Sequence, residues 1–275
     1  MNVLIYDNNG KDINGVWLSK LCDKLQKESI GFKVLTDDDL NKYNATANAI
    51  ISLGGDGTLL FLNDFSNKTG IPLLGINTGN LGFLSEFERD KIDDAVDMLK
   101  KGQLIIDKRS CLLVNHNGKE YIALNEAYVH REYTIGNTPS ASNVKIVNDN
   151  STVCKVKGDG VIISTPTGAT AYSLSAGGPI VSPNTDVFLI VSIANHSFNQ
   201  RPIVCGADVN LSVEINNGAD VGLFIDGAYI STLKSGDVFK IKKCITQTLF
   251  LRKPDFDFFK RLNYKMEQDL SKYND

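Results

Sequence analysis

The 275-residue sequence has no run of about twenty apolar residues, the length that a helix needs to cross a membrane. Its best apolar stretch, residues 187–194, has the length of a buried strand instead. The first seven residues, MNVLIYD, follow a strand pattern where a secretory signal peptide would place positive charge and then a long apolar segment. We therefore expect a cytoplasmic protein without a membrane partner.

A surplus of positive charge is also missing. The chain has 29 lysines and arginines against 32 aspartates and glutamates, a formal net charge of −3. Domains that bind nucleic acid usually carry a basic patch or stripe on one face. We therefore expect no nucleic-acid partner.

Paired cysteines and metal-ligand spacings are absent as well. The five cysteines are scattered, odd in number and never in C-x-x-C spacing: Cys22, Cys111, Cys154, Cys205 and Cys244. This pattern argues against a disulfide framework and a zinc site, and it is typical of a reducing cytosol. The three histidines are not spaced as metal ligands either, so we expect no metal ion held by the protein alone.

The common phosphate-binding fingerprints, G-x-G-x-x-G and G-x-x-x-x-G-K-[ST], do not occur. Five other glycine-bearing stretches each follow a strand-like run: GGDGT (54–58), GINTGNLGF (75–83), KGDG (157–160), STPTGATAYSLSAGGP (164–179) and FIDGAY (224–229). Glycine-rich turns at the carboxyl ends of strands can offer backbone N–H groups to an anion. The first two stretches fit a phosphorylated ligand, although a tight strand–helix connection explains a single such stretch equally well.

Residues 1–103 alternate strand and helix patterns. Trp17, Leu21 and Leu25 recur with helical spacing and predict a helix, which we expect to end at Gly31 as its C-terminal cap. Strand-like runs precede and follow it, and a second amphipathic helix is expected to end at Gly102. This alternation predicts a Rossmann-like α/β domain with a mostly parallel sheet, carrying the GGDGT and NTGNLGF loops.

Residues 104–250 lose the helical periodicity. The dipeptide Asn117-Gly118 between two strand-like runs predicts a hairpin, and further runs bounded by Gly, Asn and Asp continue to residue 241. We predict an all-β domain, sandwich-like in architecture. The last segment, residues 251–275, returns to helical spacing.

Asp56 lies in the middle of GGDGT, directly after a strand-like run. It could be a turn residue, since aspartate side chains often hydrogen-bond their own backbone in turns. The flanking glycines, however, would leave the carboxylate unshielded, and its charge would repel phosphate. A carboxylate in that position is useful if it binds a metal ion or accepts a proton from a nucleophile.

Two further groups of polar residues suit a nucleotide. Asn125 and Glu126 end a strand-like run and offer donors and acceptors for ribose hydroxyls and adenine edges, although a solvated strand end explains these two residues alone. Residues 164–179 crowd small hydroxyls and glycines around Tyr172, whose ring could stack on a base. The simpler alternative for that stretch is a plain Ser/Thr-rich loop.

In order along the chain, five motifs resemble those of the ATP-NAD kinase family: GGDGT, NTGNLGFL (77–84), LNEA (124–127), KGDGVIISTPTGATAYSLSAGGP (157–179) and HSFNQRPIV (196–204). GGDGT is shared with diacylglycerol and sphingosine kinases, whereas the long fourth motif together with the Asn-Glu pair is specific. The resemblance is strong over residues 50–205 and weak over the first fifty. It is moderate at the C-terminus, where RKPDFDFFKRL is similar to the family's closing segment.

The resemblance implies an α/β domain, a β domain, and a final segment, residues 251–275, that packs back on the first domain. The implied reaction transfers the γ-phosphoryl group of ATP, or a phosphoryl group of polyphosphate, to the 2′-hydroxyl of the adenosine ribose of NAD, giving NADP. Mg²⁺ or another divalent cation would accompany the donor. The resemblance also implies a homo-oligomer, a dimer or a tetramer, in which a neighbouring subunit could supply part of the site.

The same resemblance assigns roles to residues. Asp56 would be the catalytic proton acceptor, Gly57 and Thr58 would complete its loop, and Phe83 would line the adenine pocket, with all four in contact with NAD. The residues of the β domain that would bind NAD are Asn125, Glu126, Lys157, Asp159, Thr170, Ala171, Tyr172, Ser173 and Ser175, with Ala194 and Asp226 as secondary candidates. Two residues depart from the family's pattern: Asn195 stands where many members have proline, and Ala228 where many have a longer polar residue.

Two other functions stay open from the sequence. A lipid kinase could share GGDGT, but it needs an apolar acceptor pocket, whereas the hydroxyl-rich residues 164–179 favour a polar substrate. A non-catalytic protein that senses NAD or NADP could share the fold, but the intact Asp56 argues against it. The donor preference, the use of NADH, the number of subunits and feedback regulation do not follow from the sequence.

Overall fold

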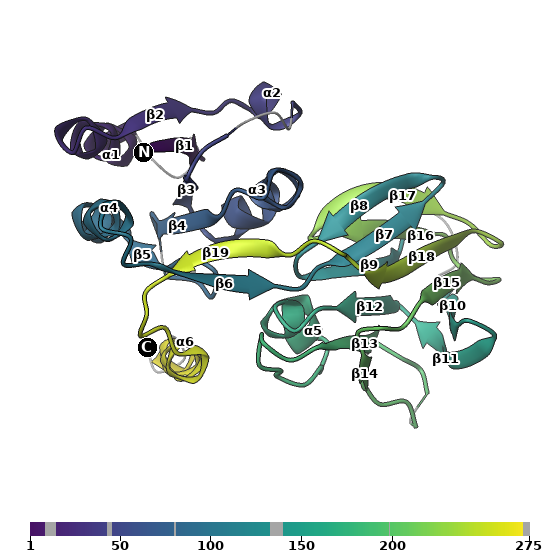
Figure 1. Ribbon diagram of the computed structural model, residues 1–275. Helices are drawn as coiled ribbons and strands as arrows, with labels where there is room; N and C mark the ends of the chain where they lie inside the picture. Colours follow the sequence, from purple (N-terminus) through teal and green to yellow (C-terminus); the bar gives the residue numbers. More distant parts are fainter. Residues whose placement is uncertain (9–14, 43–45, 80, 133–139, 198, 272–275) are drawn as a thin grey trace. The chain divides into compact units, whose positions relative to one another are not determined.

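The computed structural model describes residues 1–8, 15–42, 46–79, 81–132, 140–197 and 199–271. Figure 1 labels their helices and strands in chain order. The chain divides into two compact units, one of residues 1–108 with 248–275, the other of residues 109–247. The second unit is therefore a continuous stretch inserted into the first.

A seven-stranded sheet forms the centre of the first unit, with strand order β2-β1-β3-β4-β19-β6 and a short β5 beside β4. Its strands are β1 (Asn2–Asp7), β2 (Gly31–Val34), β3 (Ala49–Gly54), β4 (Leu73–Asn77), β5 (Phe87–Glu88), β6 (Ile105–Arg109) and β19 (Thr248–Arg252). The pairs from β2 through β4 to β19 are all parallel. The predicted mostly parallel α/β sheet is confirmed, and the last strand of the chain joins it.

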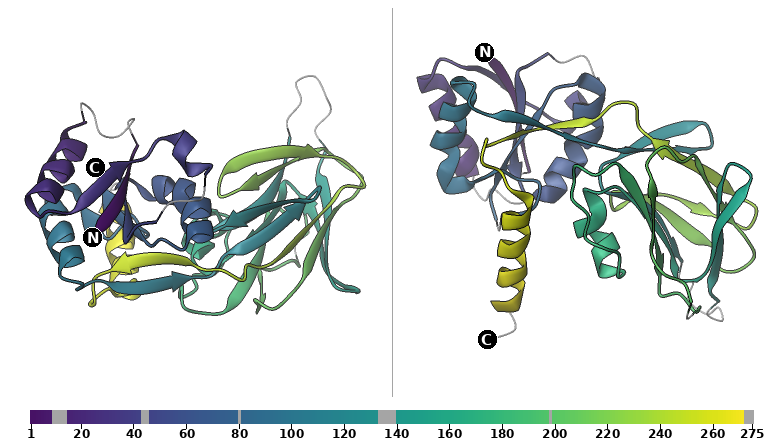
Figure 2. Two further views of the ribbon diagram at one scale, coloured as in Figure 1. Left: turned by 45° about the horizontal axis from the view of Figure 1, so that its top comes forward. Right: turned by 60° about the horizontal axis from the view of Figure 1, so that its bottom comes forward.

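Helices cover both faces of this sheet. The helices of this unit are α1 (Val16–Lys27), α2 (Asp37–Leu40), α3 (Asp56–Thr69), the 3₁₀ helix η2 (Arg89–Lys91), α4 (Ile92–Lys100) and α6 (Phe258–Ser271), of which α1, α3 and α4 pack on the sheet. Buried side chains of α1 and α4 pack with those of β1, β3 and β4 in one hydrophobic core. Figure 2 shows α1 and α4 on one face of the sheet and α3 on the other. This layering follows from the apolar stripe of each helix, which must be buried against the sheet.

The end of α1 differs from the sequence-based expectation. The helix ends at Lys27, and Ser29, with φ 57°, takes the left-handed conformation. The N–H of Ser29 donates to the carbonyl of Gln26 at 3.0 Å and the N–H of Ile30 to that of Leu25 at 2.9 Å. These two bonds form a Schellman cap two residues before Gly31, which begins β2. The prediction that Gly31 caps the helix is therefore wrong, whereas Gly102, with φ 63°, does follow α4.

The second unit consists of two antiparallel sheets. One has the order β11-β10-β15-β18-β7-β8 and the other β14-β13-β12-β9-β16-β17. The strands are β7 (Leu112–His116), β8 (Lys119–Ala123), β9 (Glu126–Arg131), β10 (Ser142–Asn148), β11 (Ser151–Gly158), β12 (Gly160–Ser164), β13 (Val187–Ile193), β14 (Ile203–Gly206), β15 (Leu211–Ile215), β16 (Val221–Ile225), β17 (Ala228–Leu233) and β18 (Val238–Lys243). Asn117 and Gly118 both have positive φ, as the predicted hairpin turn requires.

One hydrophobic core lies between these two sheets and takes buried side chains from strands of both. A smaller cluster lies on the opposite face of the β14-to-β17 sheet. There, residues of β12 and β13 pack against Ala169 and Tyr172 from the two short helices η3 (Gly168–Thr170) and α5 (Tyr172–Ser175). The predicted all-β sandwich is confirmed.

Among the described residues, none of the helices combines the length and the apolar content needed to cross a membrane.

Candidate active site

The GGDGT stretch connects β3 to α3. Gly55 is the cap of the helix and Asp56 its first residue. A side chain at Gly54 would begin 2.2 Å from Oγ1 of Thr58, so only glycine leaves room for the threonine to fold back under the loop. Thr58 is buried, and its hydroxyl accepts a hydrogen bond from Nδ2 of Asn8 at 3.2 Å.

Gly57, by contrast, is open to solvent. Among the described residues, nothing lies within 4 Å of the point where its side chain would begin. The first turn of α3 is thus accessible here, and the N-terminus of a helix attracts anions through its free N–H groups and its dipole. This part of the loop can receive a phosphate group.

Four hydrogen bonds hold the carboxylate of Asp56. Oδ2 accepts the N–H of Phe83 at 2.7 Å and the N–H of Leu84 at 3.1 Å. Oδ1 accepts the N–H of Ser85 at 3.2 Å and its hydroxyl at 3.1 Å. The expectation of an unshielded carboxylate is wrong, because the loop that follows β4 wraps around it.

Gly82 allows this close approach. A side chain at Gly82 would begin 2.1 Å from Oδ1 of Asp56. The next residue, Phe83, is half-buried, and its ring lies 6.5 Å from that of Phe258 in α6. Asn80 of the same motif lies outside the described residues. The second glycine-rich stretch therefore packs directly against the Asp56 carboxylate, and Gly82 leaves the space for this contact.

Asn125 and Glu126 are buried where β8 leads into β9, not solvated at a strand end. Their backbone is held by Asp226, which lies in the turn between β16 and β17 with φ 46°. The Asp226 carboxylate accepts the N–H groups of Leu124, Asn125 and Glu126 at 2.7, 2.8 and 3.1 Å. Asp226, proposed from the family resemblance as an NAD contact, is engaged in supporting the Asn-Glu pair.

The two carboxyl groups of this region have shifted pKa values. Burial raises the pKa of Glu126 to about 8, and the neighbouring Asp226 adds to the rise. Burial also raises the pKa of Asp226 to about 6, against the lowering effect of its three backbone hydrogen bonds. Oε2 of Glu126 is buried with no hydrogen-bond partner among the described residues. A neutral, unpaired carboxyl group can both donate to and accept from a ligand hydroxyl.

The start of the hydroxyl-rich stretch is bonded to the same strand end. The hydroxyl of Thr165 donates to the carbonyl of Leu124 at 2.6 Å, and the hydroxyl of Ser164 to that of Asn125 at 3.2 Å. A side chain at Gly168 would begin 2.3 Å from the carbonyl oxygen of Asn125. These hydroxyls and this glycine hold the chain close to the Asn-Glu pair, so they are not free to contact a ligand.

The rest of this stretch forms η3 and α5. The ring of Tyr172 meets that of Tyr128 edge-on at 4.9 Å, and the ring of Tyr128 stacks on Phe224 at 4.7 Å. Ser173 is buried, and its Oγ has no hydrogen-bond partner among the described residues. Ser175 is exposed. Thr170 ends η3 and Ala171 lies between the two short helices, and both are half-buried, so this group of residues stays partly accessible.

Lys157 and Asp159 lie at the end of β11. Lys157 is exposed, and its carbonyl accepts the N–H of His196 at 2.8 Å. Asp159 is paired with Arg131 through a contact of 2.7 Å between Oδ1 and Nε. The sequence analysis missed Arg131, because its partner is 28 positions away and no motif joins the two.

Ala194 follows β13 with φ 43°, an uncommon conformation for a residue with a side chain, and it is exposed. Its neighbour Asn195 donates from Nδ2 to Oε1 of Gln200 at 2.6 Å. Ala228, the other departure from the family's pattern, begins β17 and is exposed. Phe198 of the HSFNQRPIV motif lies outside the described residues.

Comparison with known proteins decides the family. The N-terminal domain of ATP-NAD kinase matches residues 18–104, and its C-terminal domain matches residues 124–253. The chain belongs to the ATP-NAD kinase family. An NAD kinase of Clostridium botulinum (strain Alaska E43 / Type E3) is 34% identical over 274 residues, 96% of this chain and 95% of that relative. One of Fusobacterium nucleatum subsp. nucleatum is 36% identical over 225 residues, 82% of this chain and 81% of that relative.

Solved structures of an NAD kinase and an NADH kinase share the fold. An NAD kinase from Archaeoglobus fulgidus in complex with ATP has a TM-score of 0.78 and 22% identity, covering 97% of this chain and 99% of its own. Yeast NADH kinase complexed with NADH has a TM-score of 0.83 and 22% identity, covering 97% of this chain and 87% of its own. The fold that the resemblance implied is thereby confirmed.

Within this ATP-NAD kinase family member, hydrogen bonds bring together some of the predicted site residues in each unit, whereas Lys157 and Asp159 have other partners and Ala194 is exposed. The first unit brings Asp56, Gly57 and Thr58 together with Phe83. The second unit brings the Asn-Glu pair together with residues 164–168. Sequence reasoning missed Asn8 and Ser85, whose side chains support the first group, because neither stands out from its neighbours by type or spacing.

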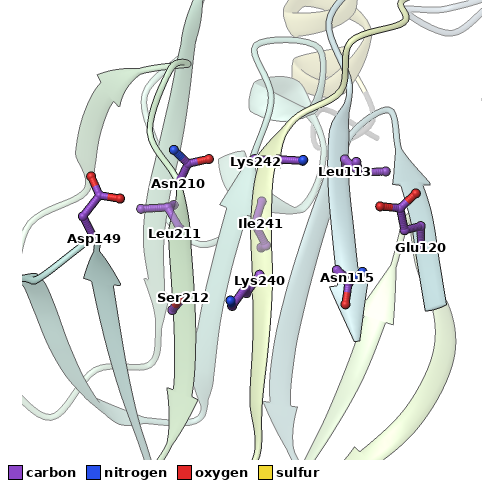
Figure 3. Close-up of a pocket in the computed structure, with 10 residues that line it drawn as sticks. All are labelled: Leu113, Asn115, Glu120, Asp149, Asn210, Leu211, Ser212, Lys240, Ile241 and Lys242. Atoms are coloured by element: carbon purple, nitrogen blue, oxygen red, sulfur yellow. The ribbon is translucent and has the colours of Figure 1, made fainter. Parts of the chain in front are cut away.

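A cavity of about 570 Å³ lies on the second unit, lined by the ten residues of Figure 3: Leu113, Asn115, Glu120, Asp149, Asn210, Leu211, Ser212, Lys240, Ile241 and Lys242. Most of the polar ones project from β7, β8, β15 and β18, away from the core between the sheets. None of the predicted site residues lines it. This cavity is therefore not the candidate active site. Among the described residues, no three of His, Cys, Asp or Glu are grouped so that they could hold a metal ion.

Proposed function

We propose that the protein is an NAD kinase, which transfers the terminal phosphoryl group of ATP to the 2′-hydroxyl of the adenosine ribose of NAD and so produces NADP. The observation that carries this proposal is the match of both family domains to the chain, with 34% identity to an NAD kinase over nearly the full length of both proteins. Residues of these motifs are also hydrogen-bonded to one another, Asp56 to Phe83 and Leu84 in the first unit, and Leu124 and Asn125 to Thr165 and Ser164 in the second.

Asp56 acts as the proton acceptor in this proposal. A ribose hydroxyl becomes a good nucleophile only when its proton has somewhere to go, and a positioned base contributes roughly 10²–10⁴-fold to the rate. All four of the acceptor positions that a carboxylate offers are in use in Asp56. To accept a proton, Asp56 exchanges one of them for the substrate hydroxyl. The hydroxyl of Ser85 is the donor that can leave at least cost, because it can rotate away while the three backbone N–H groups stay fixed.

Asn125 and Glu126 bind ribose hydroxyls in this proposal. Support comes from the buried Oε2 of Glu126, which lacks a partner among the described residues, and from the raised pKa of its carboxyl group. The loop with Thr170, Ala171, Tyr172, Ser173 and Ser175 encloses the base and sugar, and Phe83 lines the adenine pocket. In this proposal Lys157 and Asp159 also contact NAD, and Ala194 is a secondary contact. Asp226 supports the backbone of the Asn-Glu pair.

The phosphoryl donor brings Mg²⁺ or another divalent cation. Mg²⁺ is usually held by one or two carboxylates together with phosphate oxygens and water, so it needs no cage of three protein ligands. When bound, the cation would supply positive charge against that of the triphosphate. The open first turn of α3 at Gly57 supplies N–H groups to the same phosphates.

The test is a matrix of donors and acceptors with purified protein and Mg²⁺. ATP or polyphosphate is combined with NAD, NADH, diacylglycerol or a sphingoid base, and NADP(H) or lipid phosphate is measured. We expect NADP from ATP and NAD. In the Asp56→Asn variant we expect the fold and NAD binding to persist while kcat falls about 10²-fold or more. Phosphorylation of a lipid instead, or no product at all, contradicts the proposed function, and near wild-type kcat in Asp56→Asn removes Asp56 from the mechanism.

We also infer a cytoplasmic homo-oligomer, a dimer or a tetramer. All five cysteines are free, as in proteins of a reducing compartment. Large apolar side chains are exposed on both units, for example Tyr229 at 55% and Phe259 at 60%, and such residues are common where subunits meet. Light scattering coupled to size-exclusion chromatography gives the number of subunits, and a monomer at micromolar concentration contradicts this inference.

A further inference from the structure

The loop of residues 82–85, which holds Asp56 through its N–H groups, is held at its carbonyl groups as well. The donors on that side are two arginines from the end of the chain, Arg252 in β19 and Arg261 in α6. All these residues belong to the first unit. The loop is thus fixed between a carboxylate and two guanidinium groups.

Arg252 is the largest fully buried side chain of the described residues, with 0% of its surface exposed. Nη1 donates to the carbonyl of Leu84 at 2.7 Å and Nη2 to the carbonyl of Phe83 at 3.3 Å. Glu86 and Asp107 balance its charge, each at 3.3 Å. Its shortest bond therefore goes to the carbonyl of Leu84 and not to either carboxylate. Arg252 thus binds the loop in addition to forming buried ion pairs.

Arg261 completes the arrangement from the first turns of α6. Its Nη1 donates to the carbonyl of Gly82 at 2.9 Å and to that of Ser85 at 3.1 Å. Its side chain is 12% exposed, and its contact with Glu86 is long, at 3.9 Å. The loop carbonyls are accordingly its main partners among the described residues.

Three consecutive peptide groups between residues 82 and 85 connect these arginines to Asp56. In each of them the oxygen accepts from an arginine and the N–H donates to Asp56. The first oxygen is bonded to Arg261, and the second and third to Arg252. Hydrogen bonds arranged in a chain polarise one another, and those with a charged donor or acceptor are shorter and stronger than neutral ones.

We propose that Arg252 and Arg261 are positioning residues for phosphoryl transfer, which fix the Asp56 carboxylate through the three peptide groups of residues 82–85. The inference rests on the proposed function and deepens it. Neither arginine needs to touch the substrate. The closing segment of the chain thereby contributes to the reaction as well as to the fold.

Arg261 is the residue to test, because Arg252 is fully buried and its replacement would disturb folding. The variants are Arg261→Gln, Arg261→Lys, and Lys260→Gln as a matched control. Lys260 is the exposed neighbour on the same helix, and its replacement removes the same charge without touching the loop. The measurements are kcat for NADP formation at saturating ATP and NAD, the Kd for NAD, and circular dichroism to confirm the fold.

In Arg261→Gln we expect kcat to fall about tenfold to a hundredfold, since a small misplacement of a reacting group is costly. The Kd for NAD should change less than kcat does, because the residues proposed to bind ribose are in the other unit and, of the 82–85 loop, only Phe83 is proposed to contact NAD. Arg261→Lys should recover part of kcat, because its ammonium can still donate to one loop carbonyl. Lys260→Gln should behave as wild type.

Hydrogen exchange of the amides of residues 83–85 gives a second readout that needs only Arg261→Lys. We expect faster exchange at these amides and unchanged exchange in β1 and β3, whereas general destabilisation would raise exchange throughout the unit. A folded Arg261→Gln with kcat within about twofold of wild type overturns the inference while the proposed function stands. A wild-type protein that makes no NADP overturns the proposed function first, and the inference with it.

Discussion

At the scale of single residues, two aspartates hold backbone loops in the same way, one in each unit. Asp56 accepts the N–H groups of residues 83–85, and Asp226 accepts those of residues 124–126. In both cases one carboxylate accepts hydrogen bonds from three consecutive backbone N–H groups that are not bonded within a helix or a strand. Each carboxylate thus gives a motif of the family a defined backbone shape.

The contact between Gly82 and Asp56 leads to a prediction. In Gly82→Ala the new methyl group would lie 2.1–2.2 Å from the carboxylate atoms of Asp56, so the side chain or the loop must move. We expect kcat to fall about 10²-fold and the free energy of unfolding to fall by about 1–3 kcal/mol. Steady-state kinetics and urea unfolding measure the two effects.

Gly79→Ala is the matched control for this prediction. Gly79 belongs to the same loop region, is exposed, and its nearest neighbour would be Oδ1 of Asn77 at an ordinary 3.6 Å. We expect kcat and stability near those of wild type. Equal losses in the two variants would show that any alanine disturbs this loop, and that the contact with Asp56 is not special.

The raised pKa of Glu126 predicts a pH dependence of stability. Its pKa rises from 4.5 to about 8 on folding, so the folded protein binds more protons than the unfolded chain between these values. The associated stabilisation is complete below pH 4.5 and is lost as the pH rises through about 8. The loss is at most about 1.4 kcal/mol per pH unit. Asp226, with its pKa raised from 3.8 to about 6, adds a slope at lower pH.

Glu126→Gln keeps the shape of the side chain and removes its titration. We expect the variant to gain stability relative to wild type as the pH is raised from 5 to 9, with the smallest difference at pH 5. Urea unfolding at pH 5, 7 and 9 measures this, with the exposed Glu120→Gln on β8 as the control. Parallel pH profiles for wild type and Glu126→Gln would mean that Glu126 is ionised in the folded protein.

At the scale of secondary structure, the sequence identifies elements better than their ends. Apolar spacing predicts α1, α4 and α6, and the dipeptide Asn117-Gly118 predicts its hairpin, because these signals depend on local geometry alone. The cap of α1 was misplaced, since a serine in the left-handed conformation carries no sequence signal and a glycine two residues later does. Strands β9, β14 and β17 were missed because motif residues interrupt or adjoin them.

The cap of α1 provides a test with one substitution at two places. Ser29→Gly replaces a serine at φ 57° with the residue that adopts this conformation freely, and it should stabilise the protein by about 1 kcal/mol. Ser19→Gly, on the exposed side of the same helix, should destabilise it by about 0.5–1 kcal/mol. Thermal or urea unfolding gives both values. A loss of stability in Ser29→Gly would contradict the assignment of the cap.

At the scale of the whole molecule, the insertion of one unit into the other limits what a sequence can reveal. The first 103 residues give a convincing α/β pattern by themselves, yet their sheet is incomplete. β19 lies between β4 and β6 and comes from residues 248–252. The pairing of a strand with partners more than 140 positions away depends on tertiary structure, which local propensity does not encode. The supporting contacts of Arg131, Arg252 and Asp226 were hidden for the same reason.

This topology predicts how fragments of the chain fold. Residues 109–247 contain both antiparallel sheets and the core between them, so this fragment should fold alone with a cooperative urea transition. Residues 1–108 alone lack β19, which leaves an edge of β4 open and Glu86 buried without Arg252, a loss of about 3–5 kcal/mol for a broken buried pair.

We therefore expect the 1–108 fragment to be unfolded or aggregated, and a fusion of residues 1–108 to 248–275 through a flexible Gly-Ser linker to regain cooperative unfolding. Far-UV circular dichroism and urea titration of the three fragments measure this. The same fusion carrying Arg252→Met separates the two causes, because it restores the strand but not the partner of Glu86. Cooperative folding of residues 1–108 alone would mean that β19 completes the sheet without being needed for it.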